Sequence, residues 1–363
     1  MVRISNIQLF MLVVVFIVGS TTLFALGIGA GRDAWIVMLL EALAGAVVLW
    51  VYTQFPKWFP HQTFAHMLKV ILGKKLGIPL LALYCFYFYN QVYYNFYEFG
   101  ALIKLTTLEL TPILVILYIF IFAMIYMIYL GFEVIARTCE ILLPYLIFFL
   151  LIIFILASLS EGFDITEMLP VLSEGFKPIL EEWRVSIGFP YGEMVVFLTF
   201  WHYVDKHEHI RKVTFWALAV STFFVILSII VMISMLGPEL TGKTEIPLLE
   251  TILAIKVAEI ITNLDSLAVF IIFIGGFYKT ILHFMGFYLT FTWLVKSAKV
   301  KWLFFVISMF YPIISYYRFP GLDIQRWIGP GDATYIVPIF ACLPIFLLII
   351  GYLKRKREGT FTM

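Results

Sequence analysis

The chain has 363 residues, of which 63% are hydrophobic, 18% aromatic and only 13% charged. Soluble domains carry about 25% charged residues, so a chain with half that supply must meet lipid over most of its exterior, and its many aromatic residues exclude a disordered chain. The net charge of +2 leaves no basic face strong enough to bind nucleic acid.

Apolar stretches between the charge clusters predict ten membrane-spanning helices, because a bilayer core of about 30 Å needs roughly 20 apolar residues per helix. In chain order, the predicted spans are Ile7 to Gly29, Trp35 to Phe55, Ile78 to Leu105, Thr111 to Leu130, Ile135 to Leu159, Ser186 to Tyr203, Val213 to Leu236, Leu264 to Val295, Trp302 to Tyr317, and Tyr335 to Leu353. The first span lacks the cleavage site of a signal peptide, and we expect it to remain a helix.

These spans predict one integral membrane domain over residues 1–363. Helices one to five occupy residues 7–159, helices six to ten occupy residues 186–353, and two long outer segments cover residues 161–183 and 238–261. If the N-terminus is cytoplasmic, the inner segments hold 16 of the 25 Lys and Arg residues and the outer segments hold eight. Cytoplasmic loops carry the excess of basic residues, so both termini are predicted to be cytoplasmic.

Two of the spans contain residues that interrupt a helix. The first has VGSTT at Val18 to Thr22, and the sixth has GFPYGE at Gly188 to Glu193. Unwound backbone is tolerated inside a membrane only where it lines a cavity or is buried in protein. Helices one and six are corresponding members of two five-helix halves, which favours an inverted-repeat transporter fold with a ligand site at the midplane. The alternative is a proline that only bends helix six.

Ionisable side chains within the spans are candidates for function, because a charge in the membrane interior is costly. They are Glu41, Glu98, Glu193, Asp265 and Lys279. Lys279 needs an anionic partner, for which Glu193 and Glu98 are available. Such a set could relay protons, neutralise a ligand charge or serve only the structure. Glu41 lies among small residues and is predicted to be a structural or proton-sensitive carboxylate.

One face of the third helix also predicts a cavity wall. Its residues recur at spacings of three and four and are Tyr84, Tyr87, Gln91, Tyr94 and Glu98. Phenols, an amide and a carboxylate are poorly suited to lipid, although an aromatic stripe packed between helices remains an alternative, above all for Tyr84.

The segment from His202 to Lys212 gathers three histidines and two acidic residues. Metal ligation is one interpretation of these residue types, but its place at the inner membrane surface favours a solvated loop. Nucleotide-binding and hydrolase motifs are missing from the sequence, so we expect neither an enzyme nor a cofactor. The cysteines, Cys85, Cys139 and Cys342, fall within apolar runs and are predicted to be buried thiols.

The chain resembles, over nearly its whole length, the B subunit of spore germination receptors. That spore permease family belongs to the amino acid/polyamine/organocation superfamily and has a leucine-transporter type fold. The segments that carry the resemblance are QLFMLVVVFIVGS at Gln8 to Ser20, Asp33 with Trp35, LELTP at Leu108 to Pro112, PVLSEGFKPI at Pro170 to Ile179, GEMVVFL at Gly192 to Leu198, and LDSLAVF at Leu264 to Phe270. The PVLSEGFKPI segment is the most specific.

The resemblance implies a nutrient sensor of the spore inner membrane that works with an A subunit and a lipoprotein C subunit. By position, the family's germinant pocket falls at Gly19, Tyr87, Gln91, Phe189, Pro190 and Lys279. With their neighbours on the breaks and on helices three and eight, the candidate ligand-binding residues are Gly19, Ser20, Thr21, Tyr87, Gln91, Tyr94, Gly188, Phe189, Pro190, Tyr191, Glu193, Phe277 and Lys279. Candidates for proton or charge coupling are Glu41, Glu98, Glu193 and Lys279.

The expected ligand is a small amino acid or a similar nutrient, since half-helix termini and unwound carbonyls suit a zwitterion. Gln91 and Lys279 are polar where relatives that sense alanine are smaller or neutral, so the ligand of those relatives does not transfer. A charged Lys279 pointing into the pocket favours a carboxylate, or restricts the pocket to a small ligand. The alternative function is a secondary amino-acid transporter, coupled to protons through Glu193 or Glu98.

Overall fold

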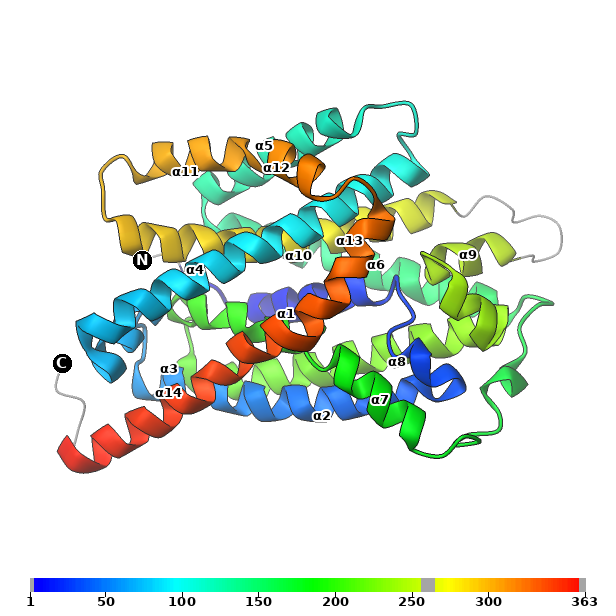
Figure 1. Ribbon diagram of the computed structural model, residues 1–363, viewed down its shortest axis with the longest axis horizontal. Coiled ribbons are helices and arrows are strands. Elements are labelled where there is room, and N and C mark those ends of the chain that lie inside the picture. The colour runs from blue at the N-terminus through cyan, green and yellow to red at the C-terminus, as the bar shows by residue number, and fades with distance from the viewer. Residues whose placement is uncertain (1–2, 256–264, 359–363) are drawn as a thin grey trace.

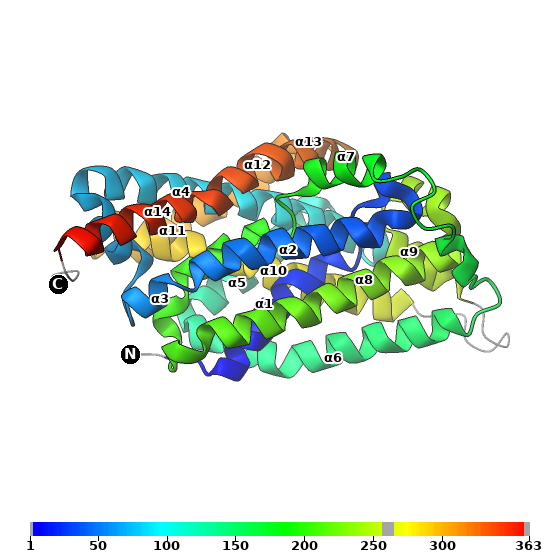
Figure 2. The same ribbon diagram turned by 90° about the horizontal axis from the view of Figure 1, so that it is seen from below.

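The computed structural model describes residues 3–255 and 265–358, and Figures 1 and 2 show them as a bundle of helices. In chain order its elements are α1 (Asn6–Thr21), η1 (Ile28–Asp33), α2 (Ala34–Tyr52), α3 (Phe55–Trp58), α4 (Phe64–Thr106), α5 (Ile113–Leu130), α6 (Phe132–Ser158), η2 (Ile165–Met168), α7 (Lys177–Ser186), η3 (Gly192–Thr199), η4 (Trp201–Tyr203), η5 (His207–His209), α8 (Ile210–Lys243), α9 (Pro247–Ala254), α10 (Asp265–Val295), α11 (Val300–Met309), α12 (Tyr311–Arg318), α13 (Leu322–Gly331), η6 (Asp332–Ile336) and α14 (Val337–Glu358).

Eight of the predicted spans are long apolar helices. Counted over the two described ranges, eight helices are long and apolar enough to cross a membrane, and each overlaps a predicted span. The two remaining spans are the pair predicted to be broken. Residues 7–29 form the shorter helix α1 and an irregular link, and residues 186–203 form turns and 3-10 helices. The all-α membrane class is therefore confirmed. The break predicted at Gly188 to Glu193 falls at the turn between α7 and η3, whereas the one predicted at Val18 to Thr22 is wrong in position, because α1 stays helical to Thr21 and the irregular link follows it.

Helix α1 lies in the centre of the bundle and is buried on every side. From Leu12 to Thr21, each of its side chains is 1% exposed or less, as expected for a helix that is apolar all round. It packs against α6, α8 and α10. At its contact with α10, a Cβ built on Gly19 would lie 2.4 Å from the Cα of Gly275. This glycine pair allows the two backbones to touch.

Helix six begins earlier than the sequence indicated. Helix α7 covers Lys177–Ser186, most of which we had assigned to the outer segment 161–183. Its charged residues conceal an apolar edge, on which Ile179 is fully buried. After Ser186 the chain turns through Phe189 and Tyr191 into η3. Thus the predicted start of helix six at Ser186 was wrong: that residue ends the first half of a broken helix.

The second predicted outer segment, residues 238–261, is also divided in the structure. Helix α8 continues to Lys243 after a kink at Gly237, whose φ is 74°. Helix α9 follows at Pro247–Ala254, and residues 256–261 lie outside the described residues, as does the side chain of Asp265.

The first and last described residues lie at the same end of the bundle, which we call the terminal end (Figure 1). The chain closes this end through a parallel bridge between Ile4 and Val204 and an ion pair of 2.8 Å between Arg3 and Asp205. The Arg3 guanidinium, which hydrogen bonds to Asp205, lowers the pKa of that carboxyl. The opposite end, with α7, α9 and α13, we call the cavity end.

The histidine segment 202–212 belongs to this closure and is only partly a solvated loop. His202 and His207 are buried, whereas Asp205 and His209 are exposed. The ring of His207 packs on that of His61, with centroids 3.8 Å apart, and its Nε2 accepts a hydrogen bond from the His61 backbone N–H at 3.1 Å. Residue types alone did not show that the α3–α4 turn would cover these side chains. Cys85 and Cys139 are buried, as predicted, whereas Cys342 is only half-buried.

Candidate functional site

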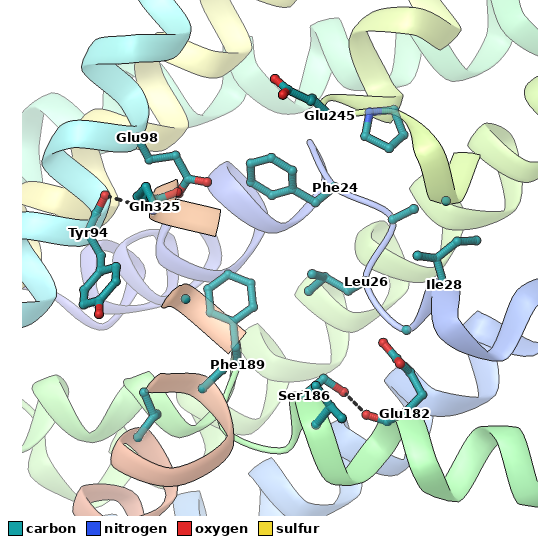
Figure 3. A pocket seen from close by; sticks show the side chains of 18 of the residues that line it. Phe24, Leu26, Ile28, Tyr94, Glu98, Glu182, Ser186, Phe189, Glu245 and Gln325 are labelled. Carbon is teal, nitrogen blue, oxygen red and sulfur yellow. Dashed lines mark hydrogen bonds between the residues drawn. The ribbon is translucent and has the colours of Figure 1, made fainter. Parts of the chain in front are cut away.

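A cavity of about 530 Å³ lies next to both helix breaks (Figure 3). The link after α1 forms one wall, α4 a second, and α7 with the following turn a third. The α8–α9 turn, α13 and the start of α14 complete it. Its described lining residues are Phe24, Ala25, Leu26, Gly27, Ile28, Gln91, Tyr94, Asn95, Glu98, Glu182, Val185, Ser186, Phe189, Glu193, Thr241, Gly242, Thr244, Glu245, Pro247, Gln325, Gly329, Ala333 and Val337.

The α4 wall presents polar side chains from a single helix face. Gln91, Asn95 and Glu98 follow one another at spacings of four and three, so they point the same way. The amide of Asn95 donates to the carbonyl oxygen of Gln91 at 2.9 Å. Beside this wall, Gln325 of α13 donates to the carbonyl oxygen of Tyr94 at 3.4 Å (Figure 3). The segment of residues 318–332 therefore contributes a wall of the cavity.

The link after α1 is held by hydrogen bonds that end the helix. The hydroxyls of Thr21 and Thr22 donate to the carbonyl oxygens of Ile17 and Val18. The link then turns at Gly27, whose φ of 76° lies in the left-handed region. It thereby aims Phe24 and Leu26 at the cavity, as Figure 3 shows.

The turn after α7 supplies the innermost wall, which consists of Phe189 and Glu193. Beneath it lies the ammonium group of Lys279 from α10, 2.7 Å from Oε2 of Glu193 and 3.8 Å from the centroid of the Phe189 ring. Both members of this ion pair are buried, and Lys279 is 0% exposed. An opposite charge and an aromatic face together stabilise a buried ammonium group.

This geometry changes the role that the sequence suggested for Lys279. A Lys279 ammonium group that pointed into the pocket would favour a carboxylate there, or would restrict the pocket to a small ligand. Instead it pairs with Glu193, one of the two carboxylates available to it, and Phe189 separates it from the cavity. Glu193 thus balances the charge of Lys279. The cavity is lined here by Glu193 and Phe189 and not by the ammonium group.

The cavity brings together five of the predicted site residues, Gln91, Tyr94, Glu98, Phe189 and Glu193. The others lie behind its walls. Gly19 packs on Gly275, Tyr87 stacks on Phe340 with centroids 4.3 Å apart, Gly188 touches Ala333, and Tyr191 shares a hydrogen bond of 2.9 Å with Thr222. Ser20, Thr21, Pro190, Phe277 and Glu41 are likewise absent from the described lining. Of these residues, Gly19, Ser20 and Thr21 lie at the end of α1, and Gly188, Pro190 and Tyr191 lie in the turn after α7.

Sequence reasoning missed the part of the cavity that comes from the outer segments. Glu182 and Ser186 lie one helical turn apart on α7, and Thr241 and Glu245 lie where α8 passes into α9. Both segments were predicted only as long outer segments, without a part in the site.

The lining combines amides, carboxylates and apolar surface. Gln91 is 3% exposed, and its Nε2 donor has no hydrogen-bond partner among the described residues. Buried donors are normally satisfied, so an open donor in a cavity wall marks a place where a ligand oxygen can bind. Carboxylates of Glu98, Glu182, Glu193 and Glu245 stand around the same space. A volume of about 530 Å³ is within the range of small-molecule sites.

The fold and this site define a membrane protein of the leucine-transporter type, with a cavity at two broken helices. The sequence then identifies the family: residues 3–320 match the family described as "Spore germination protein", and the chain belongs to it. It is 29% identical to spore germination protein KB of Bacillus subtilis (strain 168), over 98% of this chain and 96% of that protein. It is 27% identical to spore germination protein A2 of the same organism, over 89% and 87% of the two chains.

Solved structures show the same fold at low sequence identity. The nucleobase-cation-symport-1 family transporter Mhp1, in a closed conformation with bromovinylhydantoin bound, matches with a TM-score of 0.57 at 15% identity and covers 98% of this chain and 80% of its own. MhsT in complex with L-phenylalanine matches with a TM-score of 0.56 at 14% identity, over 95% and 99% of the two chains.

Proposed function

We propose that this protein is the nutrient-sensing B subunit of a spore germination receptor and that it binds a small amino acid or similar nutrient in the cavity. The observation that carries the proposal is the open donor of Gln91 in a cavity that adjoins both helix breaks. Family membership supports the role in germination.

The lining supports a zwitterionic ligand. A ligand carboxylate would accept from the Gln91 amide, and its ammonium group would lie among the carboxylates at Glu98, Glu182 and Glu193. Apolar side chains such as Phe24 and Leu26 would meet the ligand's side chain. This orientation reverses the one expected from Lys279, because that cation is already paired.

We place the protein in the inner membrane of the spore, with both termini in the cytoplasm and the cavity end outside. The bias of Lys and Arg and the common end of the two termini support this orientation. The resemblance to receptor B subunits supports A and C subunits as partners, to which ligand occupancy would be signalled.

The test is the nutrient dose response of spores that carry Gln91→Leu. Loss of one buried hydrogen bond to the ligand should shift the half-maximal nutrient concentration upward by about tenfold. Gln62→Leu, which alters an amide near the terminal end, is the matched control and should leave the response unchanged. An unaltered dose response in Gln91→Leu at normal protein levels contradicts the site.

A secondary amino-acid transporter is the second candidate, because the solved structures that share the fold include transporters. In that case Glu98, or the Glu193–Lys279 pair, would couple transport to protons. Uptake of labelled amino acids into proteoliposomes separates the two functions. Binding without accumulation supports the sensor, and sustained accumulation supports the transporter.

A further inference from the structure

A second buried carboxylate, Glu41 of α2, lies outside the cavity and takes no part in the ion pair of Lys279. It is 2% exposed, and neither of its oxygens has a hydrogen-bond partner among the described residues. Carboxylates are rarely buried in this way unless they are paired, because an ionised carboxylate without a counter-charge is unstable in apolar surroundings.

The groups around Glu41 come from the two sides of the helix-six break. Ser186 and Glu182 approach it from α7, and Tyr191 approaches it from the turn. The hydrogen of the Ser186 hydroxyl is donated to the carbonyl oxygen of Glu182 at 2.9 Å, as Figure 3 shows. The Ser186 oxygen also lies beside Glu41, so a turn of this hydroxyl brings its hydrogen to the carboxyl group.

Five charged residues of the other elements packed against α2 are engaged elsewhere. From η1, Asp33 accepts from the backbone N–H of Leu172, and Arg32 donates to the carbonyl oxygen of Leu169. Arg211 of α8 binds Thr53 near the terminal end, and Lys354 of α14 donates to the carbonyl oxygen of Val70. From η3, Glu193 pairs with Lys279. None of these contacts neutralises Glu41, and its facing carboxylate, Glu182, adds repulsion.

We propose that Glu41 is a proton-binding site that exchanges with the cavity through Ser186. Ser186 and Glu182 line the cavity, while Glu41 lies behind them. In the loading step, the Ser186 hydroxyl turns from the Glu182 carbonyl oxygen towards Glu41, and its O–H bond breaks as the proton bonds to a Glu41 oxygen. The Ser186 oxygen takes a replacement proton from hydronium in the cavity, which leaves a water molecule, an intact hydroxyl and a neutral Glu41.

The face of α2 that carries Glu41 is in close contact with the turn at the helix-six break. Gly45 lies four residues after Glu41 on this face, and a Cβ added to Gly45 would lie 2.6 Å from the Cβ of Tyr191. Ionised Glu41 would draw water or move apart from Glu182, which loosens this contact. Neutral Glu41 therefore stabilises the break at low pH, and this stability is lost as the pH rises through the range in which Glu41 ionises.

The test uses the full-length protein in lipid nanodiscs and the proton as its only ligand, so it is independent of nutrient binding. At neutral pH, the infrared spectrum should contain a carboxylic-acid C=O band that Glu41→Gln removes and that Glu109→Gln, at an exposed site, retains. In deuterated buffer the band should shift more slowly in Ser186→Ala than in the control Ser158→Ala, which alters an exposed serine of α6.

Two results would overturn the proposal. A spectrum in which Glu41→Gln removes no band means that Glu41 is ionised, and equal exchange in both serine variants means that Ser186 is not the route. If Glu41→Gln does not accumulate, Tyr191→Phe replaces it, because removal of the neighbouring hydroxyl should shift the frequency of the same band. An unshifted band then contradicts the assignment.

Discussion

At the scale of single residues, the pairing of Lys279 with Glu193 gives the first prediction. Lys279→Met leaves Glu193 buried without its counter-charge and should lower the free energy of unfolding by about 3–5 kcal/mol. The double variant Lys279→Met/Glu193→Gln removes both charges and should recover most of that loss. Thermal unfolding of the purified proteins measures both effects.

A surface ion pair is the control for this comparison. Lys243→Met breaks a helical pair with Glu239 on the exposed end of α8 and should change stability little. If Lys279→Met is as stable as Lys243→Met, the buried pair has no structural role. If the double variant is no better than Lys279→Met, the loss comes from packing and not from charge.

Individual site residues were predictable from the sequence where a helix face was polar within a span. Gln91, Tyr94 and Glu98 satisfy this criterion, and all three line the cavity. The criterion could not tell a residue that faces the cavity from one that supports it from behind. Tyr87 has the same spacing but packs on Phe340 of α14. The spacing could not show this contact, because the two residues lie more than 200 positions apart in the chain.

At the scale of elements, the contact between α1 and α10 gives the next prediction. Gly19→Ala places a methyl group 2.4 Å from the Cα of Gly275, so the helices must separate. Overpacking of this kind costs about 1–3 kcal/mol, and we expect a lower unfolding temperature for Gly19→Ala. A larger substitution at Gly19 would therefore test helix packing and not ligand binding.

Gly162→Ala is the matched control, because the nearest atom to its added methyl group is 4.0 Å away, on Met235. The two variants should differ clearly in unfolding temperature. Equal temperatures would show that α1 and α10 are not in the close contact described here.

The existence of the elements was easier to predict than their limits. The apolar spans located the long helices, since membrane thickness sets their length. Composition failed at α7, where Glu181, Glu182 and Arg184 suggested a surface segment. These charges are tolerated because α7 packs on α2 through one apolar edge and borders a cavity on another side. Three-dimensional placement, which the sequence pattern does not contain, decides such cases.

At the scale of the whole molecule, the structure is closed at one end and hollow towards the other. The Ile4–Val204 bridge and the His61–His207 contact close the terminal end, whereas the cavity adjoins α7, α9 and α13. A ligand that enters the cavity reaches both helix breaks without passing the ion pair of Lys279. Ligand occupancy is thus placed where it can alter how the broken helices pack.

Equilibrium binding of labelled amino acids to the purified protein tests whether the cavity is a nutrient site. We expect saturable binding of at least one amino acid and its loss in Ala25→Trp, which fills the cavity. Ala123→Trp, at an exposed position of α5, should bind as the unaltered protein does. Absence of saturable binding across the twenty amino acids, or equal binding by Ala25→Trp, would rule out an amino-acid site in this cavity.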